Sequence, residues 1–311
     1  MKFPFSIKTE AEFDVVGFGT NAVDFLISVP EYPKFDSKVE LTKYVQAAGG
    51  EVASTLVGLQ RLGMTTSYIG SFGTDSAGEF GYESLVKEGV ELSNVRFVEG
   101  ASTQIAFIVI DESSGERTVL WKRDEQLKIS VSDAPLYLAE KTRLLHLTPH
   151  DTSACLALAK AAKDSKTVVS IDVDNFFVGL TDVLMFVDVL IASSDFSAKI
   201  YGEIEKKKAL KNLKKDFGCA VVGMTLGARG SIFLCGDEFI KTKGFSVPGG
   251  CRDTTGAGDA FRTGFLYGLL CGDTVSKAAE KANAVAALKC RAIGARTSLP
   301  TSDELHQFLS V

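Results

Sequence analysis

Short apolar runs rich in β-branched residues alternate with segments of helical periodicity along most of this chain, and this alternation restricts its fold more than any other feature. The runs lie at 13–18, 66–70, 144–147, 168–172, 187–191 and 220–225. Buried strands separated by helices are typical of βαβ units, because parallel strands need a long crossover connection. The pattern therefore predicts an α/β fold with a doubly wound, mostly parallel sheet flanked by helices.

Two regions depart from this alternation, since 25–46 and 103–122 carry strand signals without an intervening helix. The second region reads as a hairpin around a turn at 112–115. We expect these strands, within about 25–48 and 100–124, to form a small accessory sheet that covers the carboxyl ends of the parallel strands as a lid. No Pro/Gly-rich linker divides the 311 residues, so we expect a single domain over 1–311.

Composition narrows the class of protein. A formal net charge of -5 argues against nucleic-acid binding, which normally requires a basic patch. No stretch reaches the roughly 18 apolar residues of a membrane span, and the N-terminus has no long apolar signal region. The six cysteines are scattered without a CxxC pair, which indicates reduced thiols and a cytoplasmic protein. The three histidines lack metal-ligand spacing, so we expect them to be structural.

The segment 253–261 reads DTTGAGDAF and continues into an apolar helical pattern that extends to Leu270. A glycine-containing loop before a helix exposes unpaired N–H groups and a positive dipole end, which attract an anion such as a phosphate. A carboxylate at Asp259 has no evident part in holding a nucleotide there. It suits a group that receives a proton from an attacking hydroxyl, and the segment therefore predicts phosphoryl transfer.

Three further glycine turns follow predicted strands, at 17–22 (GFGTNA), 48–51 (AGGE) and 225–230 (TLGARG). A threonine hydroxyl with glycine N–H groups at a strand end suits nucleotide phosphates. The first turn fits the GxGxxA pattern of nicotinamide oxidoreductases, which we keep as an alternative. That pattern requires a helix, whereas 23–30 alternates like a strand and ends at a proline. Asp24 is then either a hydrogen-bond acceptor for a polyol or a turn aspartate.

The segment 253–259 resembles the C-terminal signature of the ribokinase-like (PfkB-type) carbohydrate kinases. The segment 48–63, with Gly70 and Gly73 after it, resembles their N-terminal signature, which is less specific. The order of features matches the family from Gly17 to the C-terminus. This resemblance implies an ATP- and Mg²⁺-dependent kinase that transfers the γ-phosphate of ATP to a sugar hydroxyl.

The resemblance also implies roles for individual residues. Asp259 corresponds to the catalytic base, and the anion hole consists of Gly256, Ala257 and Gly258. The implied nucleotide contacts are Thr225, Gly227 and Gly230, with Asn283 near the adenine. The implied sugar contacts are Asp24, Gly49 and Gly50. Asp253 and Thr255 are similar to a loop that binds a monovalent cation, which makes K⁺ a further implied cofactor.

The chain departs from the family pattern at two places. Ser54 stands where the family usually has an asparagine, and we expect Glu51 to replace that sugar contact. The family's Asn-x-x-Glu motif associated with magnesium is replaced by Ser-Ser-Asp-Phe at 193–196, where Asp195 is expected to act on Mg²⁺ through water. This Ser-x-Asp and the segment 31–37 resemble ketohexokinases, which favours a ketose or another hexose-type substrate.

The lid sequence leaves the charge of the substrate open. Arg117, Lys122 and Arg123 on the predicted lid are candidate contacts for a sugar acid or sugar phosphate, or else ordinary surface charges. Two further functions remain as alternatives, namely a nucleoside kinase on the same fold and a non-catalytic protein that binds a sugar or nucleotide. An exposed lid sheet also predicts a homodimer that pairs through the lid.

Overall fold

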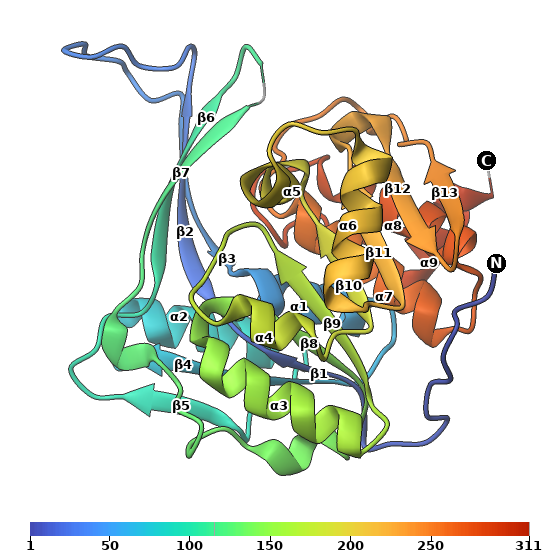
Figure 1. Cartoon of the computed structure of the whole chain (residues 1–311). Coiled ribbons are helices and arrows are strands. Elements are labelled where there is room, and N and C mark those ends of the chain that lie inside the picture. Colours follow the sequence, from blue (N-terminus) through green and yellow to red (C-terminus); the bar gives the residue numbers. More distant parts are fainter. Residues whose placement is uncertain (115, 311) are drawn as a thin grey trace.

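The computed structural model describes residues 1–114 and 116–310, and it places nine of the strands within them in one main sheet (Figure 1). Their order across the sheet is β13 (Glu238–Thr242), β12 (Ser231–Cys235), β11 (Val221–Thr225), β10 (Val189–Ala192), β9 (Val168–Val173), β8 (Thr142–Leu147), β1 (Phe13–Phe18), β4 (Thr66–Gly73) and β5 (Val95–Val98). All neighbours from β5 to β11 are parallel, whereas β12 and β13 are added antiparallel. The strand order reverses between β1 and β8. Ligands of such sheets bind at this point, beyond the carboxyl ends of the strands.

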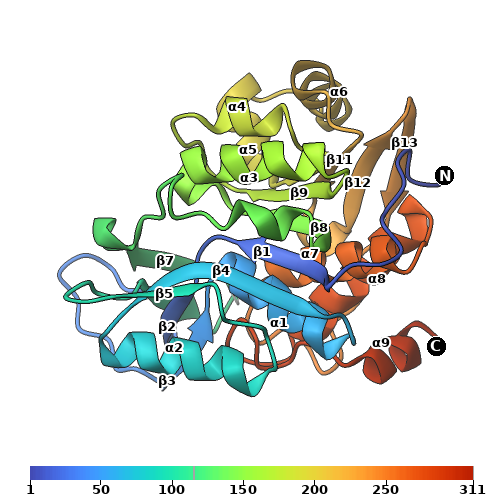
Figure 2. The same ribbon diagram turned by 90° about the horizontal axis from the view of Figure 1, so that it is seen from below.

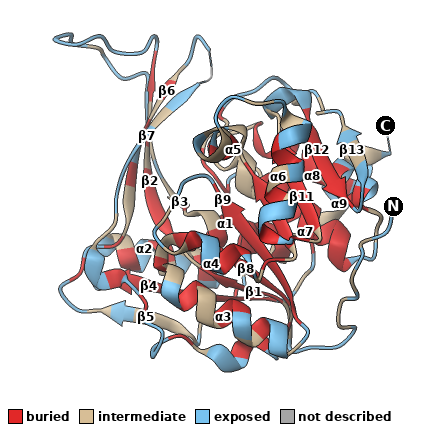
Figure 3. Ribbon diagram, viewed as in Figure 1, coloured by how far each residue is buried: buried red, intermediate tan, exposed pale blue. Residues whose placement is uncertain are grey.

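Helices cover both faces of this sheet (Figure 2). One face carries α3 (Thr152–Asp164), α4 (Leu180–Leu184), α5 (Ser194–Tyr201) and α6 (Lys206–Phe217), and the other carries α1 (Glu51–Arg61), α2 (Ser76–Lys87), α7 (Ala257–Leu270), α8 (Val275–Lys289) and α9 (Ser302–Leu309). The central strands are buried between two apolar cores (Figure 3). This arrangement confirms the predicted doubly wound fold. Short 3₁₀ turns complete the connections at η1 (Glu125–Leu127), η2 (Leu136–Ala139), η3 (Pro149–Asp151) and η4 (Gly227–Arg229).

A separate four-stranded sheet, which we call the lid, rises beside the main sheet (Figure 1). Its strand order is β3 (Lys43–Gly49), β2 (Ala22–Val29), β6 (Ile105–Asp111) and β7 (Arg117–Lys122). The predicted hairpin is confirmed, since β6 and β7 pair antiparallel with Ile110 opposite Arg117, although residue 115 of its turn lies outside the described residues. The lid starts at Ala22 rather than 25, because β2 follows β1 almost directly and no helix intervenes.

The two faces of the lid differ in character. On the inner face Leu26, Ala106 and Ile108 are buried and pack against Ile293 of the main body. Side chains alternate between faces along a strand, so Asp24 shares this inner face with Leu26. The outer face carries Phe25 stacked on Phe107, with ring centroids 5.2 Å apart. In the part of the chain that the structure describes, no helix is long and apolar enough to cross a membrane.

Candidate active site

The loop 253–258 ends at the N-terminus of α7, as the sequence predicted, and it exposes backbone donors there. Gly256 is the N-cap residue with a φ of 73°, a left-handed conformation that glycine adopts without strain. Because glycine has no side chain to cap the helix, no side chain takes up the first-turn N–H groups, although the Ala257 amide donates to the Thr254 carbonyl oxygen at 3.0 Å. Ala257, Gly258 and Asp259 form this first turn. The predicted anion hole and the predicted base are therefore adjacent on one helix turn.

Asp253 fixes the shape of this loop. Its side chain is 1% exposed, and its Oδ1 accepts a hydrogen bond of 2.7 Å from the Thr255 amide. Its Oδ2 accepts a bond of 2.8 Å from the Gly294 amide, which ties the loop to the segment after α8. The Lys289 ammonium donates to the Asp253 carbonyl oxygen at 2.9 Å. The Asp253 oxygens that the sequence assigned to a monovalent cation are thus engaged by protein donors, whereas the other assigned side chain, Thr255, keeps a buried Oγ1 without a hydrogen-bond partner among the described residues.

Asp24 lies on the inner face of the lid and is 5% exposed. A Cβ atom on Gly49 would come within 2.0 Å of its Oδ2, so any larger residue there would displace the carboxylate. A Cβ on Gly50 would approach Asn21 Cα to 2.4 Å, where β1 passes into β2. The predicted sugar-contact residues Asp24, Gly49 and Gly50 are therefore brought together. The glycine pair leaves space for this buried carboxylate. We use the name crevice for the site formed by Asp24, Glu51, Asp172 and Asp259, whose carboxyl groups are linked by their charges.

The carboxylates of the crevice have raised pKa values. Burial raises the pKa of Asp259 to about 7, with the nearby charge of Asp24 adding to the rise and that of Arg262 opposing it. Burial likewise raises the pKa of Asp24 to about 6, although the Arg296 guanidinium lowers it in part. Burial and the negative charge of Asp172 raise the pKa of Glu51 well above its usual range. Perturbed groups of this kind are typical of functional sites.

Glu51 is the first residue of α1, and it faces His150, one of the three histidines that the sequence predicted to be structural. His150 Nδ1 lies 3.8 Å from Glu51 Oε2, and burial lowers the pKa of His150 to about 4, so its ring is neutral at pH 7. Phe177 packs at 4.9 Å from the His150 ring, and Trp121 of the lid approaches that ring edge-on at 6.1 Å. These residues form an aromatic wall next to the Glu51 carboxyl group.

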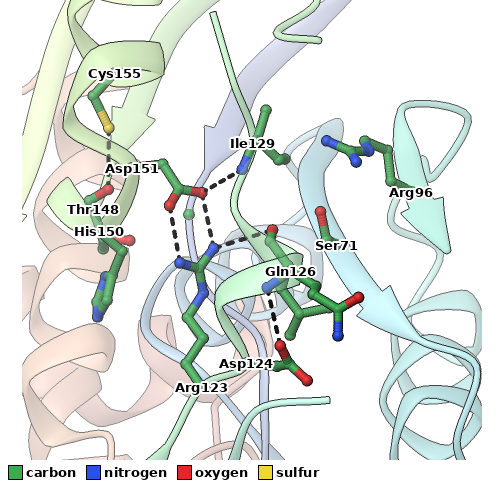
Figure 4. Close-up of polar contacts among 12 residues, drawn as sticks. Ser71, Arg96, Arg123, Asp124, Gln126, Ile129, Thr148, His150, Asp151 and Cys155 are labelled. Carbon is green, nitrogen blue, oxygen red and sulfur yellow. Dashed lines mark hydrogen bonds and ion pairs between the residues drawn. The ribbon is translucent and has the colours of Figure 1, made fainter. Parts of the chain in front are cut away.

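Arg123 is engaged within the protein (Figure 4). Its Nη1 and Nη2 donate to the two carboxylate oxygens of Asp151 at 2.9 and 2.8 Å, and Asp151 also accepts a bond from the Ile129 amide. The pair ties the end of β7 to the turn before α3. A contact between Arg123 and an anionic substrate would require a free guanidinium. In the structure this guanidinium is bound to Asp151.

The other cations near the crevice are also engaged. Arg117 on the lid donates to Thr254 Oγ1 at 2.6 Å, so the lid touches the loop 253–258. Arg262, on α7, forms a buried ion pair with Asp172 and donates to the Ile191 carbonyl at 2.9 Å. Arg296 is 7% exposed and donates to the Gly49 carbonyl, to Ser54 Oγ at 3.2 Å and to Ser84 Oγ at 2.8 Å. Ser54 thus binds this guanidinium.

The predicted nucleotide-binding residues gather at the end of β11. Thr225 ends that strand, and Gly227 begins the η4 turn that Gly230 closes. Gly230 has a φ of 95°, and a Cβ there would come within 2.1 Å of the Thr242 carbonyl oxygen. Asn283 of α8 donates to Thr242 Oγ1 at 2.9 Å and to Ser231 Oγ at 3.2 Å. These contacts place Asn283 next to the η4 turn. Its side-chain amide nitrogen hydrogen-bonds to both β12 and β13.

Asp195 stands apart from this group. It is an exposed residue in the first turn of α5, whose N-cap is Ser193, and its carboxylate accepts a bond of 3.3 Å from Ser194 Oγ. Among the described residues no group of three or more His, Cys, Asp or Glu could hold a metal ion.

Sequence reasoning missed several residues of the crevice, namely His150, Asp172, Asp174, Arg262, Lys289 and Arg296. Arg262 could have been found, since it lies one helical turn after Asp259 on α7. The positions of Asp172 and Asp174 at the end of β9 also carried a signal, because ligands bind at strand ends. No pattern in the sequence pointed to Lys289 or Arg296 as residues of the site. Each reaches the site only through the folding of the C-terminal segment.

Comparison with known proteins gives a consistent result. Residues 13–302 match the family described as pfkB family carbohydrate kinase. The chain is 27% identical to an ATP-dependent 6-phosphofructokinase of Thermoanaerobacterium thermosaccharolyticum, over 95% of this chain and 94% of that protein. It is 30% identical to an ATP-dependent ribose-1-phosphate kinase of Halopiger xanaduensis, over 92% and 95%. The fold is similar to that of Arabidopsis thaliana ribokinase, with a TM-score of 0.83, 23% identity and coverage of 96% and 99%.

The Arg123–Asp151 pair generates a prediction about stability. We expect Asp151→Asn to lower the free energy of unfolding by about 3 kcal/mol, because it leaves a largely buried guanidinium without its charged partner. The matched control is Asp133→Asn, whose partner Arg96 and carboxylate are 37% and 46% exposed, so its loss should stay below about 1 kcal/mol. Urea unfolding of both variants measures the difference. Equal losses would show that the Arg123 pair does not anchor the lid.

Proposed function

We propose that this chain, which belongs to the pfkB family of carbohydrate kinases, transfers the γ-phosphate of ATP to a hydroxyl group of an uncharged sugar. As a member of that family it is an ATP-dependent carbohydrate kinase, and ATP with Mg²⁺ is general for these enzymes. The uncharged character of the sugar and the roles of individual residues are our proposal. We further propose that residues 1–311 act as one kinase domain, and that the protein is cytoplasmic.

The charge balance of the crevice carries the proposal of an uncharged substrate. Asp24, Glu51 and Asp259 present carboxyl groups there, and each has a raised pKa. Of the cations that could offset a phosphate or carboxylate on the sugar, Arg123 is paired with Asp151. Arg117 donates to Thr254 Oγ1 and keeps its charge, but that charge already acts on the Asp24 and Asp259 carboxyl groups, whose pKa values it lowers in part. Like charges placed close together cost several kcal/mol in recognition. We therefore do not infer a phosphorylated sugar as the substrate of this chain, although two relatives are named as a 6-phosphofructokinase and a ribose-1-phosphate kinase.

The lid supplies two complementary contacts to a sugar. Asp24 lies opposite Ala106 in the β2–β6 register, and Ala106 lies opposite Trp121 in the β6–β7 register. Directly opposed residues point to the same face of a sheet, so this row has a carboxyl group and an indole on either side of a small residue. The Asp24 carboxylate would accept sugar hydroxyl protons, while Gly49, Gly50 and Glu51 would line the opposite side of the sugar. The Trp121 ring would pack on an apolar ring face.

In the proposed reaction Asp259 accepts the proton of the attacking hydroxyl. The N–H groups of Gly256 and Gly258 stabilise charge that develops on the transferred phosphoryl oxygens, and that of Ala257 joins them by leaving the Thr254 carbonyl oxygen. Thr225, Gly227, Gly230 and Asn283 hold the nucleotide, the last at the adenine side. Mg²⁺ bound with ATP supplies charge neutralisation, and Asp195 is the residue that we propose to contact it through water. We include no K⁺ ion, because the Asp253 oxygens are engaged by protein donors.

A nucleoside kinase is the second candidate, and one observation favours it. The aromatic wall of Trp121, His150 and Phe177 would stack on a planar base as readily as on a sugar face. The Trp121 side chain is 55% exposed, which leaves it free to contact a ligand. The two candidates share the same base and the same anion hole. They differ in which part of the acceptor meets this wall.

A substrate panel separates these possibilities. We expect ADP release with neutral hexoses, ketoses or pentoses, at a kcat/KM about a hundredfold above that for the corresponding sugar phosphates and sugar acids, because an added anion would face uncompensated carboxylates. Nucleosides belong in the same panel. A preference for nucleosides would favour the second candidate, and a preference for phosphorylated sugars would contradict the proposed charge balance. Binding of sugar without turnover across the panel would indicate a non-catalytic protein.

The role of Asp259 can be tested through pH and substitution. Its carboxyl group must be ionised to take a proton, and its pKa is raised to about 7, so kcat/KM should fall about tenfold per pH unit below that value. Asp259→Asn should lower kcat at least about a hundredfold. At pH 8 the free energy of unfolding of this variant should be no lower than that of the wild type. The reason is that a carboxyl group with a raised pKa in the folded state destabilises the fold once it is ionised. Full activity of the variant would refute the mechanism.

We also propose that the protein forms a homodimer through the outer face of the lid. Phe25, Tyr44, Phe107 and Leu120 share this face, and the last three are 58%, 44% and 59% exposed. The loop between β2 and β3 projects beyond the body of the molecule and carries the fully exposed Phe35 (Figure 1). Such an apolar sheet face is unusual on a monomer, and a second lid would offer it an equivalent apolar partner.

Light scattering after gel filtration tests the dimer. We expect a dimeric mass at micromolar concentration, and a monomeric mass for Phe107→Glu, because the substitution buries a charge in the apolar interface. Val178→Glu is the matched control, since Val178 is a 92% exposed apolar residue that lies off the lid. That variant should remain dimeric. A wild-type protein that is monomeric at this concentration would contradict the proposal.

A further inference from the structure

A buried ammonium group lies beneath the loop 253–258. Lys289 is the last residue of α8, and its side chain is 0% exposed. The ammonium donates to the Asp253 carbonyl oxygen at 2.9 Å and lies 3.7 Å from Asp253 Oδ2. Lysine is among the residues that are almost never fully buried without a partner, because removing the charge from water is costly. A lysine at this place therefore calls for an explanation.

Packing alone does not account for this lysine. Burial lowers the pKa of Lys289, and the Asp253 carboxylate opposes that change, so the carboxylate helps to retain the ammonium charge. The backbone of Lys289 is held separately, since Ser298 Oγ donates to its carbonyl oxygen. A methionine or leucine would fill similar space at the end of α8 without the cost of burying a charge. The positive charge itself is therefore the informative feature.

The loop offers this ammonium the surroundings that a monovalent cation would need. Hard cations bind oxygen ligands, and Asp253 presents a carbonyl oxygen and a carboxylate at this point. An ammonium group carries the same single charge as K⁺ and is of nearly the same size. Thr255 and Gly294 amides occupy the two carboxylate oxygens from the other side, which leaves Lys289 as the cation that faces them.

We propose that Lys289 serves this enzyme as a built-in monovalent cation, which holds the anion-hole loop in place and makes a dissociable K⁺ unnecessary. Lys289 is a positioning residue, because its ammonium contacts Asp253 and not the reacting atoms. Its contact fixes the carbonyl of Asp253, and the Asp253 carboxylate in turn fixes the Thr255 amide, next to Gly256. The inference rests on the proposed role of Gly256–Gly258 in phosphoryl transfer.

The first test uses the wild-type protein. We expect kcat to change less than about twofold when choline chloride is replaced by KCl or NaCl at equal ionic strength, because the site already holds its cation. We expect the melting temperature to be equally insensitive to the choice of cation. The melting measurement needs no substrate, so it tests the cation site even if the proposed sugar kinase activity is wrong. An activity or a melting temperature that rises clearly and specifically with K⁺ would overturn the proposal.

The second test removes the ammonium. Lys289→Ala should lower kcat about a hundredfold in choline chloride, since a small displacement of catalytic groups has effects of this size. Adding KCl or NH₄Cl, but not choline chloride, should raise the kcat of the variant about tenfold or more and should also raise its melting temperature. A lysine that only fills space would give no such rescue. Lys277→Ala is the matched control, because Lys277 lies exposed on the same helix, and it should behave as wild type.

The remaining outcomes are also decisive. A folded Lys289→Ala variant with full activity in choline chloride would overturn the proposal, as would one that no cation restores. If the variant does not fold, Lys289→Arg and the wild-type cation series still decide the matter. The arginine retains the charge in a larger group, so it should keep the indifference to K⁺ even where kcat falls. An arginine variant that requires K⁺ would overturn the proposal.

Discussion

The carboxylate of Asp253 is the interaction on which the rest of the site depends. One oxygen holds the Thr255 amide within the loop, and the other holds the Gly294 amide of the segment that follows α8. Removal of this buried acceptor would leave the Thr255 amide before α7 and the Gly294 amide after α8 without their partner, and unsatisfied buried donors are costly. The loop then could not keep the first-turn N–H groups of α7 directed at one point. Precise electrostatic stabilisation of a transferred phosphoryl group requires that fixed direction.

A second constraint is the distribution of charge around the crevice. Burial drives the pKa values of Asp24 and Asp259 upward to about 6 and about 7, which brings both near the working range of a general base. Arg262 and Arg296 limit that rise, yet their N–H groups are directed at Asp172, Gly49 and other protein acceptors. The cations thus tune the carboxylates and are themselves held in place. The same arrangement is the basis of our proposal that the acceptor is uncharged.

The fold and the family could be predicted from the sequence, whereas the partners of individual side chains could not. The alternation of strands and helices has a physical period, so the main sheet and α7 could be read without a structure. The loop 253–258 is equally local, because its donors and Asp259 lie within one helix turn. Arg123 is the opposite case. Its sequence context suggested a free lid charge, whereas Asp151, 28 residues later, binds it in the folded protein. Long-range pairing of this kind leaves no periodic signal.

The sequence by itself thus determined the doubly wound sheet, the lid hairpin and the glycine-containing loop before α7, because periodicity and turn chemistry act over a few neighbouring residues. Only the tertiary structure decided which groups surround that loop. Lys289 and Arg296 reach Asp253 and Gly49 across 36 and 247 residues of sequence. Such contacts depend on how α7 and α8 pack against the sheet and on where the C-terminal segment returns. The composition of the crevice follows from that packing, and our proposal of an uncharged acceptor rests on it.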